Sequence, residues 1–135
     1  MDRNTPKKSA DTIKLPVAAG EIIYMGNMVT TNAMGCAILS MGLYAMPVFG
    51  VAMETVDNSE GGNGDAHVLI QHGMVFLLQN DQVVPVAEDG IFDVVHVRDS
   101  ITVCNDVNAP QVAGINYGVV DEGVWVYIPT TGKFF

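Results

Sequence analysis

The chain has 135 residues, a formal net charge of −9, 49% hydrophobic residues and only 16% charged residues. A chain of this length folds as one domain that buries roughly two-thirds of its unfolded surface, so its core needs neither a metal nor a disulfide. The acidic body argues against a nucleic-acid partner, because phosphate binding needs clustered Lys or Arg. The low share of charge favours a sandwich or barrel core or burial against other subunits, and we expect a homo-oligomer.

The chain begins with a basic arm, residues 1–14. This arm carries two acidic residues and four of the six basic residues, namely Arg3, Lys7, Lys8 and Lys14. Its net charge is therefore +2, whereas residues 15–135, with two basic and thirteen acidic residues, carry −11. We divide the chain into this flexible arm and a single β domain over residues 15–135. The arm is either a solvated terminus or a segment that docks onto an acidic protein surface, and it has no apolar stretch of a secretory signal.

Short apolar or alternating runs, separated by Gly, Asn or Asp, predict strands along the rest of the chain. These runs are residues 13–18, 21–30, 35–39, 48–55, 66–71, 74–79, 92–98, 100–104, 111–120 and 124–129. Short strands at close spacing favour an all-β fold, a compact barrel or sandwich. His72–Gly73 predicts a tight hairpin turn between two of the strands. The best helix candidate is Leu39–Met46, one or two turns that end at Pro47.

Residues 22–53 contain no charged residue and six of the eight methionines. The most apolar part, residues 37–53, is shorter than the roughly twenty apolar residues of a spanning helix and is interrupted by Pro47, so we expect no membrane span. Methionine adapts to irregular contact surfaces as well as to cores. We interpret this segment as part core and part subunit contact. The predicted oligomer interface consists of Met41, Leu43, Tyr44, Met46 and Phe49.

Residues 56–73, VDNSEGGNGDAHVLIQHG, look most like a functional site because acids, glycines and two histidines lie close together. Counted from Asp57, the third and fifth positions are serine and glycine, which breaks the calcium-loop pattern. His67 and His72 are five residues apart, so on a strand they point to opposite faces and do not form a zinc pair. The glycines are flanked by acids and followed by no Lys, which argues against phosphate. We interpret residues 57–65 as a solvated connection and expect no metal or cofactor.

The sequence contains no recognisable catalytic set. Ser59 and Ser100 lack a histidine-containing signature, and His96 alternates with valines on a predicted strand face. We therefore expect no catalytic residue and a protein that is not an enzyme. Cys36 and Cys104 are far apart and form no CxxC motif, which favours two reduced thiols, with a disulfide left open.

Three runs together resemble the small head-decoration, or cement, proteins of tailed bacteriophages: FGVAMETVDNSEGGNGDAHVLIQHGMVFLL, VVPVAEDGIFDVVHVRDSITV and AGINYGVVDEGVWVYI. The resemblance covers about residues 21–128, although each motif alone is a generic β-hairpin. It implies a compact, β-tulip-like protein, made in the host cytoplasm, that binds the capsid exterior of the virion and stabilises the lattice of the major capsid protein. It also implies a homotrimer, or a dimer, with the N-terminal arm contacting the capsid.

Two other functions stay open. One alternative is a different phage structural role, as a tail-tube, neck or fibre-associated β-domain. The other is a non-viral β-barrel that binds a small ligand or a sugar. Trp125 and Tyr127 lie two residues apart on one strand, so they share a face and are the candidate stacking platform for such a ligand.

Overall fold

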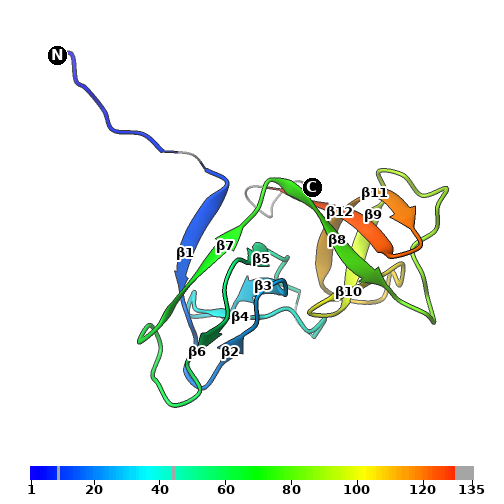
Figure 1. Cartoon of the computed structure of the whole chain (residues 1–135), viewed down its shortest axis with the longest axis horizontal. Helices are drawn as coiled ribbons and strands as arrows, with labels where there is room; N and C mark the ends of the chain where they lie inside the picture. The colour runs from blue at the N-terminus through cyan, green and yellow to red at the C-terminus, as the bar shows by residue number, and fades with distance from the viewer. Residues whose placement is uncertain (9, 44, 130–135) are drawn as a thin grey trace.

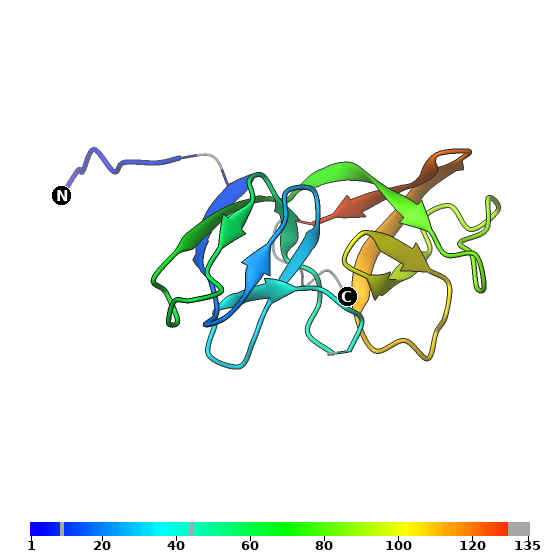
Figure 2. The same ribbon diagram turned by 60° about the horizontal axis from the view of Figure 1, so that its bottom comes forward.

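The computed structural model describes residues 1–8, 10–43 and 45–129. Over these residues the chain forms twelve strands and no helix, which confirms the predicted all-β fold. The strands form two groups that lie side by side, with the N-terminal arm projecting away from both (Figures 1 and 2).

The first group is a five-stranded sheet with a two-stranded sheet beside it. In sheet order, its strands are β1 (Thr12–Pro16), β7 (His67–Gln71), β5 (Gly50–Ala52), β3 (Met28–Thr31) and β4 (Ala37–Leu39). The small sheet pairs β2 (Ile22–Ile23) with β6 (Val56–Asp57). Val17, just after β1, bridges to Ala37 at the start of β4, so the two edges of the large sheet meet at that point. The core of this group is Val17, Ile23, Val29, Ala37, Ala52, Val68 and Ile70.

The second group is a closed five-stranded barrel. Its strands, in order around the barrel, are β10 (Thr102–Cys104), β8 (Met74–Asn80), β12 (Gly123–Ile128), β11 (Val112–Val120) and β9 (Val94–Asp99). Closure leaves no unpaired sheet edge for another chain to extend. Alternate residues of each strand point inward, and the barrel core includes Leu78, Val95, Val97, Val103, Val124 and Ile128.

Residues from the first sheet complete the core of the barrel. Met28, Val48 and Val51 are buried among the barrel residues, although the strands they come from or adjoin belong to the five-stranded sheet. Hydrogen bonds cross the same junction: the Met28 N–H donates to Ser100 O at 2.7 Å, and the Val48 N–H donates to Val112 O at 3.1 Å. The two groups therefore share buried contacts.

Most predicted strands are present, but two local predictions are wrong. Strands β7 and β8 do not form a hairpin: β7 pairs with β1 and β5, and β8 pairs with β10 and β12. His72–Gly73 instead carries the chain from the sheet into the barrel, and the Gly73 N–H donates to Ile128 O at 2.6 Å. The predicted helix Leu39–Met46 is absent from the described residues, because Gly42 adopts a left-handed conformation, φ 79°, that breaks a helix.

Candidate functional site

The basic arm extends away from the body, as Figure 1 shows. Arg3, Lys7 and Lys8 are exposed, and the hydrogen bonds found within residues 1–8 join only Arg3 and Thr5. Lys14 lies apart from them in strand β1, where its side chain is exposed and its backbone pairs with Leu69 of β7. The strand thus begins before the boundary at residue 14. Of the four basic residues of the arm, the three nearest the N-terminus are the ones free to reach a partner.

Strand β1 is an edge strand over most of its length. Its five residues pair in register with β7, from Thr12 opposite Gln71 to Pro16 opposite His67. Among the described residues, no strand pairs with the other side of β1, and the sheet edges meet only beyond it, at Val17. An open edge of this kind offers backbone N–H and C=O groups for strand addition. The arm and this edge form one continuous stretch of chain.

The predicted interface residues lie in the connection 41–49, of which residues 41–43 and 45–49 are described. Four of these eight residues are exposed, and Val48 is buried. Met41, Leu43 and Met46 expose 43%, 74% and 39% of their surface. Phe49 packs against the core of the first sheet, and Tyr44 lies outside the described residues. The fully buried Gln111 fixes the connection: its Nε2 donates to Met46 O at 2.8 Å, and its Oε1 accepts the Gly42 N–H at 3.1 Å. An interface role for this segment stays a prediction.

The acidic loop, residues 57–65, is tied together by its own side chains. Asp57 Oδ1 accepts the Ser59 N–H at 2.9 Å, and Asp65 Oδ2 accepts the Gly62 N–H at 2.8 Å. The hydrogen bonds from Ser59 hold the pKa of Asp57 below its ordinary value. Within the described residues, no group of three or more His, Cys, Asp or Glu side chains is placed to hold a metal ion. The carboxylates of this loop therefore shape the connection between β6 and β7.

A cavity of about 490 Å³ lies beside the junction of β1 and β4. It is lined by Ala18, Ala19, Glu21, Thr31, Asn32, Ala33, Ile38 and Met46. Burial raises the pKa of Glu21, and the backbone N–H of Leu39 opposes that rise by donating to the carboxylate. The Oδ1 of Asn32 accepts the N–H groups of Met34 and Cys36, so this oxygen is occupied by hydrogen bonds within its own turn. This leaves one half-buried carboxylate in an otherwise largely apolar hollow.

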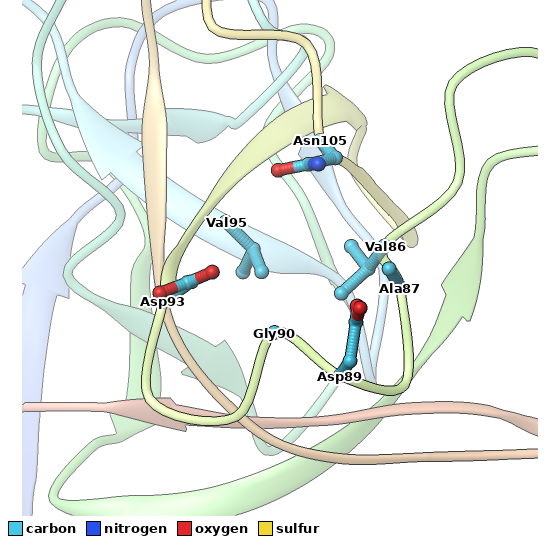
Figure 3. Close-up of a pocket in the computed structure, with 7 residues that line it drawn as sticks. All are labelled: Val86, Ala87, Asp89, Gly90, Asp93, Val95 and Asn105. Atoms are coloured by element: carbon cyan, nitrogen blue, oxygen red, sulfur yellow. The ribbon is translucent and has the colours of Figure 1, made fainter.

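A smaller pocket of about 240 Å³ opens at one end of the barrel (Figure 3). Val86 and Val95 of the barrel core line it, and the polar side chains of Asp89, Asp93 and Asn105 stand around it. It contains no histidine, serine or cysteine that would pair with a carboxylate as a nucleophile or base. Both acids precede β9: Asp89 lies in a turn, and Asp93 lies immediately before Val94, the first residue of the strand.

Trp125 and Tyr127 lie on the outer face of the barrel, as their spacing predicts. Their neighbours in β12, Val124, Val126 and Ile128, are fully buried in the core. Two further aromatic residues, Phe92 and Tyr117, join this face and were not found from sequence. The two cysteines are free thiols, buried in the structure.

A scan against protein-family models found no match for this chain, and searches of the curated proteins and of the solved structures found no significant match. Within the part of the chain that the structure describes, no helix has the length and apolar character needed to cross a membrane. The function is therefore inferred from the placement of the chain's own residues.

Proposed function

We propose that this protein is a structural component of a phage virion, a decoration protein that binds the outside of the capsid and stabilises the lattice of the major capsid protein. The observation that carries this proposal is the extended basic arm, which leads directly into the open edge of β1 (Figure 1). The resemblance of residues 21–128 to head-decoration proteins supports the same function.

The arm and the body have opposite charge, and this favours docking of the arm onto a separate acidic surface. The arm that contains Arg3, Lys7 and Lys8 projects from a body that carries −11 over residues 15–135 (Figure 1). The open side of β1 supplies main-chain hydrogen bonds, and the arm supplies charge contacts, to an exposed strand of the capsid protein. A flexible arm loses conformational entropy when it becomes ordered on the capsid. Both the main-chain hydrogen bonds and the charge contacts are therefore needed for the arm to add to capsid affinity.

Stabilisation of the lattice follows from mass action. A protein that binds the mature lattice and not its disassembled subunits stabilises the lattice by about 2.7 kcal/mol per site when its free concentration is about 100 times Kd. No catalytic group is needed for this effect. Salt weakens the contribution of the arm to capsid binding, because exposed charges are screened over about 8 Å at physiological ionic strength.

The test is co-sedimentation with emptied heads of the phage that encodes the chain. Deleting residues 1–8 removes Arg3, Lys7 and Lys8 but leaves β1 intact, whereas deletion through residue 14 would strip three of the five β1 residues from β7. We expect the shortened protein to keep its thermal unfolding midpoint and to lose at least about tenfold in capsid affinity.

A double variant, Lys7→Glu with Lys8→Glu, provides the matched charge control at full chain length. It should weaken attachment at low salt more than at high salt. Undiminished co-sedimentation of both variants would refute a role for the arm. Association of the intact protein with tails or rings instead of heads, or a gene set in a metabolic operon without a major capsid gene, would refute the decoration function itself.

A further inference from the structure

The outer wall of the barrel carries an apolar face that the capsid proposal does not use. Three neighbouring strands, β8, β12 and β11, contain no Asp, Glu, Lys or Arg, although the whole chain has a net charge of −9. The inward side chains of these strands fill the barrel core, so the outward ones need no apolar character to stabilise the barrel. Most of them are apolar nonetheless, Gln79 of β8 being an exception.

Adjacent strands align these outward side chains. Trp125 of β12 lies opposite Leu77 of β8, and Tyr127 lies opposite Val75. A β-bulge in β11 places Tyr117 on the same face, with its ring centroid 5.6 Å from that of Tyr127. We call Val75, Leu77, Phe92, Tyr117, Trp125 and Tyr127 the barrel face.

Phe92 extends this row of rings at a cost in backbone conformation. It is the one described residue other than glycine with a positive φ, 69°, and 66% of its surface is exposed. Its ring meets Tyr117 edge to face, with centroids 5.5 Å apart. A bulky residue in the left-handed region is strained, and such strain persists where surrounding contacts impose it, often at functional positions.

The buried Asn116 imposes this conformation. Its backbone C=O accepts the Phe92 N–H at 2.8 Å, and its Nδ2 donates to Gly90 O at 2.9 Å and to Ala87 O at 3.3 Å. The Phe92 ring is thus held in place before any partner arrives. Preorganised aromatic side chains bind partners with little further loss of entropy.

We propose that the barrel face binds the barrel face of a second copy of this chain, across a two-fold axis. Five of these residues, Val75, Leu77, Phe92, Tyr117 and Trp125, each expose between 36% and 66% of their surface. A contiguous exposed apolar patch of this kind marks an interaction site, and it would form the centre of an interface that buries roughly 800 Å² per partner. Charge selects the partner. Two bodies of −9 each repel, and this neutral face is where they meet with the least repulsion.

This contact requires no capsid, so it is measured on the purified protein alone. Sedimentation velocity from about 1 to 200 µM should show conversion from one copy to two. Trp125 is the only tryptophan and is 39% exposed, so its emission should shift to shorter wavelength as the dimer forms.

Tyr117→Lys places a charge at the centre of the barrel face and should weaken self-association at least about tenfold. Phe92→Ser is the second variant, since it removes a ring from the face without adding a charge. The matched control is Leu43→Lys, which places the same charge on a residue that is 74% exposed in the 41–49 connection. Unchanged thermal unfolding of each variant shows that the fold is kept.

Three outcomes would overturn the proposal. The first is a protein that stays monomeric over the whole range. The second is an oligomer that survives Tyr117→Lys and Phe92→Ser but dissociates in Leu43→Lys, which would assign the contact to residues 41–49. The third is a monomer whose Trp125 emission shifts only when oligosaccharides are added, which would make the face a sugar platform.

Discussion

Replacing Asn58 by Ala tests whether the acidic loop is an anchored part of the fold. Asn58 is 4% exposed, and its Nδ2 donates to Ala18 O at 3.0 Å, to Gly62 O at 3.0 Å and to Val17 O at 3.2 Å. One side chain thus joins the loop to the chain just after β1, where the two edges of the first sheet meet.

The expected loss follows from these bonds. The two amide hydrogens of Asn58 share three acceptors, and a net contribution of about 1 kcal/mol per bond gives about 2–3 kcal/mol. The penalty for unpaired buried carbonyls is small here, because Val17 O keeps the Gly64 N–H and Ala18 O keeps the Glu21 N–H. For a domain of this size, that loss lowers Tm by about 10 °C.

Equilibrium urea unfolding, followed by circular dichroism, measures this loss. Asn63→Ala is the matched control, since this exposed loop residue accepts one bond, from the Ala19 N–H at 2.8 Å, and should cost about 0.5–1 kcal/mol. Asn58→Asp should destabilise at least as much as Asn58→Ala, because it points a carboxylate at three carbonyl oxygens. A loss below about 0.5 kcal/mol for Asn58→Ala would refute the anchoring role.

Two further predictions concern His72 and Gly114. Burial lowers the pKa of His72, and the Asp11 charge only partly offsets this. The unfolded chain then binds the proton more readily, so stability is full above pH about 6.5 and falls as the pH drops below it. His72→Gln should flatten the unfolding free energy between about pH 7.5 and 5.5, and an unchanged slope would contradict this reasoning. Gly114→Ala places a methyl group against the backbone carbonyl of Tyr127 and should lower stability by about 1–3 kcal/mol in urea unfolding. Gly62→Ala, whose methyl meets only ordinary contacts, should cost much less, and equal losses would exclude the steric explanation.

Local pattern predicted the strands well and their pairing poorly. The run 66–71 became β7 and 74–79 became β8 with bounds within one residue, because alternation of apolar residues is a local signal. Gly73 has the positive φ, 72°, that a hairpin turn requires, yet the same conformation serves a crossing between sheets. The partner of each strand depends on contacts distant in sequence, such as the bond from Gly73 to Ile128.

For the candidate surfaces too, the sequence predicts local features but not those that depend on contacts distant in the chain. The charge of the arm is a property of composition, and the shared face of Trp125 and Tyr127 follows from their spacing. Tyr117 could not be assigned to that face, because it is the extra residue of a bulge that shifts the register of β11 against β12. Phe92 precedes β9, and only the fold of its turn brings its ring to Tyr117.

The absence of charge from the buried positions of residues 22–53 has an explanation within one chain. This segment contributes Ile23, Val29, Ala37 and Ala52 to the core of the first sheet. It also contributes Met28, Val48 and Val51 to the barrel core. The buried positions of this segment exclude charge, because burying an unpaired charge is costly. Internal packing does not account for Met41, Leu43 and Met46, which expose 43%, 74% and 39% of their surface, so an interface role for this connection stays a prediction. The outer wall of the barrel differs because its apolar side chains are aligned across paired strands, and this alignment is what favours it as the contact between copies.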